Sequence, residues 1–191
     1  MPDTARPQTV SFVHMDRGTK EDYALVTARE KELIKQLPDD LLAQLRTLAI
    51  GDSGYKIDRY QHSLQTATRA LNDGAEDEMV VAALLHDIGD TLAPDNHSQL
   101  AASVLRPYVS DRTHWVVLHH GIFQGYYYFH HIGLDRDERE RFRGHEHFQA
   151  CADFCARWDQ TSFDPDYDTL PVDAFEPALR RVLAREPFRQ V

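Results

Sequence analysis

The sequence predicts an all-α fold, and two features of its apolar residues carry that prediction. Apolar side chains recur at helical spacing through most of the chain, whereas the alternation that is typical of strands is nearly absent. The segment from about Glu76 to Asp87 is apolar almost all round, which is typical of a helix enclosed by other helices. We therefore expect a helical bundle with this segment as its buried central helix.

Residues 1–50 are predicted to form an N-terminal helical extension. We expect two helices there, one from Thr19 or Lys20 to about Gln36 and one that begins at Pro38. The Gly-Asp-Ser-Gly segment at 51–54 is a loop by composition. The main domain is then expected to span residues 51–191.

Six further helices are predicted in the main domain. They run from Tyr55 or Ile57 to Leu71, from Glu76 to Asp87, from Asp95 or Asn96 to Pro107, from Ser110 to His120, from Gly144 to Asp159 and from Val172 to Ala184. Gly89 is the expected stop of the central helix, and Ser110 is a good N-cap. A mixed aromatic segment is expected after His120.

Composition limits the classes of function. The chain has 191 residues, 42% hydrophobic and 27% charged, as is ordinary for a globular protein of one domain with or without an extension. No apolar run approaches the roughly 20 residues that cross a bilayer, and the N-terminus lacks a secretory signal, so we expect a cytoplasmic protein with no membrane partner. The net charge of −10 argues against a nucleic-acid partner. Cys151 and Cys155 are expected to be buried core residues rather than a disulfide.

His86 and Asp87, at the end of the central helix, are the strongest candidates for a functional site. A carboxylate in an apolar setting costs several kcal/mol unless a cation accompanies it. Adjacent helix positions diverge by about 100°, so a neighbouring His and Asp can contribute to one site. The two oxygens of Asp87 can also bridge two ions.

Other residues of the metal-ligand type accompany this pair. His62 lies on the preceding helix, His97 begins the following one and His120 ends the one after that. Asp159 ends a later helix. His, His-Asp, His, His and Asp therefore follow one another on successive helices, which is a strong indication of a metal site. Either His119 or His120 can face inward.

These residues resemble the ligand set of the HD superfamily. Within it the chain is most similar to the organophosphonate-degrading HD oxygenases (the PhnZ and TmpB type), with myo-inositol oxygenase as a distant relative. The segments that carry the resemblance are Tyr55–Ala67, Ala83–Gly89, Asn96–Ser98, His119–Tyr128 and Arg157–Gln160. The expected fold is thus an HD-domain helical bundle with a dinuclear metal site in its core.

The resemblance implies two iron ions. One would be held by His62, His86, Asp87 and Asp159, and the second by His97, His120 and the bridging Asp87. Imidazole and carboxylate ligands suit iron, zinc or manganese alike, so the resemblance alone indicates a mixed-valence Fe(II)/Fe(III) pair with O2 as co-substrate. It also favours His120 over His119.

Tyr55 and Asp58 match a Tyr-x-x-acid motif that precedes the first histidine in these oxygenases. The resemblance implies that the tyrosine caps the second iron until substrate displaces it, and that the acid helps to select the substrate. Alternatively, Tyr55 begins a helix and Asp58 is a carboxylate of its first turn. Gln61, Gln124, Tyr126 and Arg157 are expected to contact the substrate.

The aromatic run Phe123, Tyr126, Tyr127, Tyr128 and Phe129 permits two interpretations. It can form a cage for a quaternary ammonium group, because ring faces attract cations, or it can be core packing. The histidines expected at the surface or in polar contacts are His130, His131, His145 and His147.

The resemblance implies an oxygenase that acts on a small organophosphonate. It would use O2 to hydroxylate C1 of a 1-hydroxy-2-(trimethylammonio or amino)ethylphosphonate, releasing phosphate and glycine betaine or glycine. Two alternatives stay open. One is a metal-dependent HD phosphohydrolase acting on a small phosphate ester or nucleotide. The other is a degenerate HD domain that regulates by binding a ligand.

Overall fold

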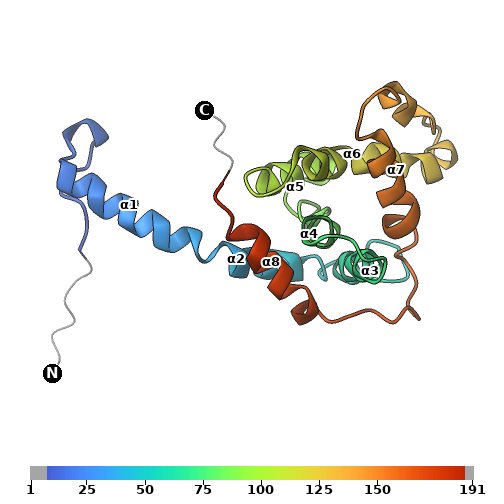
Figure 1. The fold of residues 1–191 in the computed structure, drawn as a ribbon, viewed down its shortest axis with the longest axis horizontal. Coiled ribbons are helices and arrows are strands. Elements are labelled where there is room, and N and C mark those ends of the chain that lie inside the picture. The colour runs from blue at the N-terminus through green and yellow to red at the C-terminus, as the bar shows by residue number, and fades with distance from the viewer. Residues whose placement is uncertain (1–7, 188–191) are drawn as a thin grey trace. The chain divides into compact units, whose positions relative to one another are not determined.

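The computed structural model describes residues 8–187, and all its regular structure in that range is helical (Figure 1). The described part contains eight α-helices and no strand, which confirms the all-α prediction. The helices are α1 (Lys20–Ile34), α2 (Leu37–Thr47), α3 (Arg59–Asn72), α4 (Asp77–Leu85), α5 (His97–Leu105), α6 (Asp111–Tyr128), α7 (Phe148–Phe154) and α8 (Glu176–Leu183).

The chain divides into two compact units, one up to Leu41 and one from Leu42 onward, so the boundary falls within α2. In the first unit, Thr19 caps α1 and forms a reciprocal capping box with Asp22. The carboxylate of Asp22 also accepts hydrogen bonds from the backbone and the hydroxyl of Ser11, each at 2.8 Å. Asp22 therefore joins the segment before α1 to its first turn.

In the second unit α4 is the central helix, as the sequence predicted. Every residue from Met79 to Leu85 is buried. α4 packs against α3, α6 and α8, and Figure 1 shows α4 enclosed among these helices. Such a helix can be apolar on all sides because no face of it meets water.

α6 is longer than the sequence predicted. It was expected to end at His120, but it continues to Tyr128. Gly121 and Gly125 are residues that suggest a helix end in the sequence, but in the structure they allow other side chains to approach the helix closely. A Cβ on Gly125 would lie 2.4 Å from the ring of Phe129, and one on Gly121 would lie 3.1 Å from the hydroxyl of Ser98.

α7 begins later than predicted and changes its winding at its end. Residues 144–147 form turns, α7 starts at Phe148, and a π-helical turn follows from Cys155 to Asp159. Short π-helical turns occur often at functional sites. Cys151 and Cys155 are both buried and free, as expected.

The remaining differences are small. The helix predicted from Val172 begins as a 3-10 turn, with α8 proper starting at Glu176.

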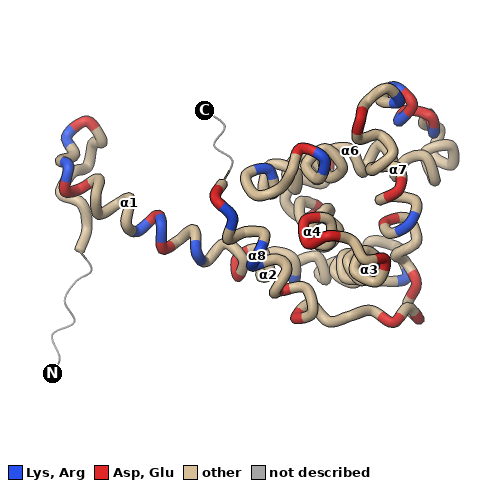
Figure 2. The backbone as a smooth tube through the Cα atoms, viewed as in Figure 1, with Lys and Arg blue, Asp and Glu red and all other residues tan. Residues whose placement is uncertain are grey.

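None of the helices in residues 8–187 combines the length and apolarity needed to cross a membrane. Basic residues are interspersed with acidic ones, for example along α1 and in the segment between α6 and α7 (Figure 2).

Candidate metal centre

Four histidines of the second unit turn the same ring nitrogen toward a common cluster. In each ring Nδ1 lies near a backbone carbonyl oxygen: Ser162 O at 2.8 Å for His62, Ala83 O at 2.9 Å for His86, Pro94 O at 3.4 Å for His97 and Val117 O at 2.7 Å for His120. A carbonyl oxygen only accepts, so Nδ1 carries the proton in these bonds. The lone pair of each Nε2 is then free to bind a metal.

The first set of ligands consists of His62, His86 and Asp159, all of them buried. His62 lies in the first turn of α3, and His86 directly follows α4. Their Nε2 atoms are 3.2 Å apart, and Asp159 Oδ1 is 3.3 Å from that of His62 and 3.7 Å from that of His86. Asp87 Oδ2 lies 3.4 Å from both Nε2 atoms.

The second set lies on the other oxygen of Asp87. Asp87 Oδ1 is 3.2 Å from Nε2 of His120 and 3.5 Å from Nε2 of His97. One carboxylate therefore faces a pair of histidines with each of its oxygens. This is the arrangement that a bridging ligand between two ions requires.

The electrostatics of the cluster call for added positive charge. Burial opposes ionisation of Asp87 and Asp159, but the surrounding histidines outweigh it and hold the pKa of both carboxyls well below the usual value. Burial also lowers the pKa of His62 and His86, yet the neighbouring carboxylates raise it above the usual value. Asp159 Oδ2 is buried without a hydrogen-bond partner. Inward-facing imidazole nitrogens, ionised carboxylates and an unpartnered oxygen are a donor set that fits divalent or trivalent cations once the imidazoles release their Nε2 protons.

His120, and not its neighbour His119, faces the cluster. His119 is half-buried, and its Nδ1 lies 2.9 Å from the carbonyl oxygen of Trp115. Its ring stacks on the indole of Trp115 at 4.1 Å between centroids. The four other histidines that were expected away from the site, His130, His131, His145 and His147, are absent from the clusters of possible metal ligands among the described residues.

A cleft of about 230 Å³ opens beside the cluster. Its polar lining includes Asp87, His97, His120, Gln124 and Asp159, and its aromatic lining consists of Tyr55, Tyr127, Tyr128 and Phe163. Gln124 donates to Asp159 Oδ1 at 2.9 Å. A cavity of this size takes a small molecule, since pockets for drug-sized ligands measure about 300–1,000 Å³.

Tyr55 is connected to the cluster through stacked rings. Its ring stacks on Phe163 at 4.6 Å, and Phe163 stacks on His62 at 4.4 Å. The sequence predicted that Tyr55 or Ile57 begins a helix, but α3 starts only at Arg59, because Asp58 is its N-cap and accepts from the backbone N–H of Gln61 at 2.7 Å.

Several expected site residues lie outside the cleft lining. Asp58 and Gln61 occupy the N-terminal turn of α3. Arg157 donates to Asp73 at 2.7 Å. The ring of Tyr126 lies beneath the guanidinium groups of Arg136 and Arg139, and Phe123 is fully buried. Of the aromatic run, only Tyr127 and Tyr128 line the cleft.

Two residues at the cluster were missed in the sequence. Arg59 donates from Nη1 to Asp87 Oδ2 at 3.3 Å and pairs through Nε with Asp90 Oδ2 at 3.1 Å. Asp90 Oδ1 lies 3.3 Å from Nδ1 of His97. Their spacing was the available signal, because Arg59 precedes His62 by three positions and Asp90 follows Asp87 by three. Residues three apart share one face of a helical turn.

The HD domain family matches residues 59–145. The chain contains an HD domain. The match includes His62, His86, Asp87, His97 and His120, while Asp159 lies beyond it. A comparison with curated proteins finds no match. The all-helical fold, the HD domain and the buried cluster of histidine and aspartate are together typical of a metal-dependent enzyme.

Proposed function

We propose that this HD-domain protein is a diiron oxygenase that cleaves a carbon–phosphorus bond. The substrate is a 1-hydroxy-2-(trimethylammonio or amino)ethylphosphonate, and the products are phosphate and glycine betaine or glycine. The observation that carries the proposal is the position of Tyr55. It lines the same cleft as Asp87, the carboxylate whose two oxygens face different histidines. The sequence resemblance to the organophosphonate oxygenases includes this tyrosine, which precedes the HD domain match.

Two adjacent ions would be held by His62, His86 and Asp159 on one side and by His97 and His120 on the other, with Asp87 between them. When bound, a mixed-valence iron pair supplies the positive charge that binds the hydroxyphosphonate and the electron that O2 requires. The protein supplies fixed imidazole orientations for His62, His86 and His120, because a backbone carbonyl lies within 2.9 Å of each Nδ1.

Arg59 is suited to the phosphonate end of the substrate. Its guanidinium lines the cleft and lies 3.3 Å from Asp87 Oδ2. Guanidinium groups bind phosphorus oxygens through charge-assisted, paired hydrogen bonds. The Arg59 guanidinium also lies 5.1 Å from the ring centroid of Tyr55, so the tyrosine and the arginine lie together in the cleft wall.

The lining favours a quaternary over a primary ammonium group in the substrate. The carboxylates that line the cleft are Asp87 and Asp159, and both belong to the metal cluster. A primary ammonium has three donors and prefers a carboxylate, whereas a trimethylammonium group has none and prefers ring faces. Tyr55, Tyr127, Tyr128 and Phe163 offer such rings. We therefore propose the trimethylammonio compound as the preferred substrate.

Oxygen dependence tests the reaction. Phosphate release from the 1-hydroxyphosphonate should require O2 and consume about one O2 per phosphate. Equal turnover under strict anaerobiosis would refute the oxygenase. The preference between head groups is tested by comparing kcat/KM for the two substrates, and a clear preference for the primary amine would contradict binding by the rings.

A metal-dependent phosphohydrolase is the second candidate. Arg59 favours it as much as the oxygenase, because a phosphate ester presents the same oxygens to the guanidinium. The cleft volume of about 230 Å³ favours a small ester over a nucleotide. This enzyme would release phosphate from an ester without O2. Anaerobic turnover of an ester, with no activity on the hydroxyphosphonate in air, would select it.

A further inference from the structure

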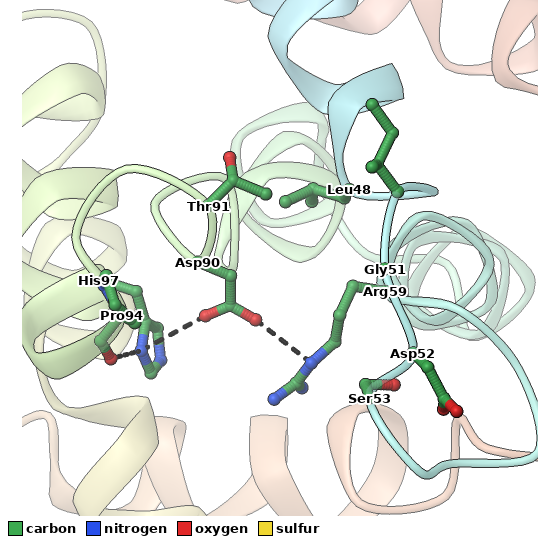
Figure 3. A pocket seen from close by; sticks show the side chains of 10 residues that line it. Leu48, Gly51, Asp52, Ser53, Arg59, Asp90, Thr91, Pro94 and His97 are labelled. Atoms are coloured by element: carbon green, nitrogen blue, oxygen red, sulfur yellow. Dashed lines mark hydrogen bonds and ion pairs between the residues drawn. The ribbon is translucent and has the colours of Figure 1, made fainter.

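A second cavity adjoins the metal centre and shares two wall residues with the cleft. It measures about 330 Å³, and both cavities are lined by Arg59 and His97. Asp90 lines the second cavity and is absent from the lining of the cleft. Figure 3 shows Asp90 between Arg59 and His97, with one oxygen toward each.

His97 differs from the other three histidines in how its Nδ1 is held. His62, His86 and His120 each have a backbone carbonyl within 2.9 Å of Nδ1. The carbonyl of Pro94 is 3.4 Å from Nδ1 of His97, and Asp90 Oδ1 is slightly nearer at 3.3 Å. The side chain of His97 is also 25% exposed, whereas those of the other three are at most 3% exposed. His97 is thus the ligand that its surroundings restrain least.

We propose that Asp90 is the positioning residue of the second metal ion and acts through His97. This inference rests on the proposed dinuclear centre. A carboxylate that accepts the Nδ1 proton fixes the tautomer and orientation of a ligating imidazole and increases its basicity. Asp90 supplies that carboxylate to the one histidine without a short backbone partner.

Arg59 holds Asp90 in place and connects it to Asp87. Arg59 Nε pairs with Asp90 Oδ2 at 3.1 Å, and its Nη1 donates to Asp87 Oδ2 at 3.3 Å. His97 Nε2 lies 3.5 Å from the other oxygen of Asp87. Asp87, the proposed bridging residue, is therefore connected to His97, the most exposed ligand, through Arg59 and Asp90. A guanidinium fork suits this task because its donors have fixed directions.

Asp90→Asn tests the inference because it keeps the shape and removes the charge. Apoprotein is titrated anaerobically with Fe(II) or Co(II) against a competing chelator, which gives a Kd for each ion. We expect the Kd of the second ion to rise about 10–100-fold, with that of the first ion changed by less than about threefold. In the Co(II)-loaded protein, the paramagnetically shifted Nδ1–H signal of one histidine should move while the other three stay. Asp90→Glu should restore part of the affinity.

Asp111→Asn is the matched control, because Asp111 also pairs with an arginine, Arg106, but lies away from the cluster. It should leave both Kd values unchanged. Equal weakening of both ions in Asp90→Asn, or no change in either, would overturn the role of Asp90 while leaving the dinuclear centre standing. A wild-type protein that binds fewer than two ions would contradict the proposed centre itself.

Discussion

Removal of the Asp87 carboxylate should weaken both metal sites together. Asp87 Oδ2 faces His62 and His86 at 3.4 Å, and Oδ1 faces His120 at 3.2 Å, so Asp87→Ala takes one ligand from each set. Four protein ligands hold a structural zinc ion by about 10–16 kcal/mol, or about 2.5–4 kcal/mol per ligand. One ligand is then worth about 10²–10³-fold in affinity. The second ion should lose more affinity, because the set of His97 and His120 takes its carboxylate from Asp87, whereas the first set also contains Asp159.

The assay is metal analysis after equilibration at a buffered free-metal concentration about tenfold above the wild-type Kd. Wild-type sites are then about 90% filled, and a 100-fold weaker site is about 10% filled. His97→Ala should chiefly lose the second ion, because its imidazole touches only that set. Circular dichroism checks that each variant remains helical. Two retained ions in Asp87→Ala would refute the assignment of this residue as the bridge.

Three further predictions concern packing and charge. Gly89→Ala should selectively lower the affinity for the second ion, because the added Cβ would lie 2.7 Å from the carbonyl oxygen of His97. In the control variant Gly144→Ala the Cβ meets nothing within 4 Å, so both ions should bind normally. Phe123→Ala should lower the free energy of unfolding by about 3–5 kcal/mol in urea denaturation, since the ring is fully buried; a loss under about 1 kcal/mol would contradict its place in the core. Hydrogen bonds lower the pKa of Asp22 from 3.8 to about 2, so its stabilisation of the first unit is complete above about pH 4 and is lost as the pH falls toward 2. The carboxyl carbon shift of Asp22 against pH measures this, and a midpoint near 4 would argue against the hydrogen bonds.

The central helix could be predicted from sequence because a helix that is buried on all sides consists almost entirely of apolar residues. A segment apolar on every face, ending in His86 and Asp87, has few structural interpretations. The end of α6 could not be predicted in the same way. Gly121 and Gly125 suggest a helix end, and only the approach of Ser98 and Phe129 to these glycines reveals that they permit packing within a continuous helix.

The candidate ligands could be proposed from sequence because their type is distinctive and each lies at or near a helix end. The residues around them could not. Phe163 reaches His62 from a loop about 100 positions later, and nothing in the spacing of single residues predicts such a contact. Arg59 and Asp90 could not be predicted for another reason. Charged residues in helical turns are usually solvated, and only the structure reveals that this pair lies against Asp87 and His97.

The cleft lining combines charged and aromatic groups, and this bears on the choice between the proposed functions. Two bound metal ions with Arg59 would outweigh Asp87 and Asp159, so the cluster attracts an anion even in a protein of net charge −10. The same lining carries the aromatic rings of Tyr55, Tyr127, Tyr128 and Phe163. Ring faces favour a cation that has lost its hydrogen-bond donors.

A zwitterion with a phosphonate and a quaternary ammonium group uses both kinds of lining at once, because each charge meets its complement. A plain phosphate ester uses only the metal ions and Arg59 and makes no use of the ring faces of Tyr127 and Tyr128. The aromatic lining has a purpose in the oxygenase that it lacks in a hydrolase of simple esters. For this reason the aromatic lining, more than the shared metal ligands, supports the oxygenase.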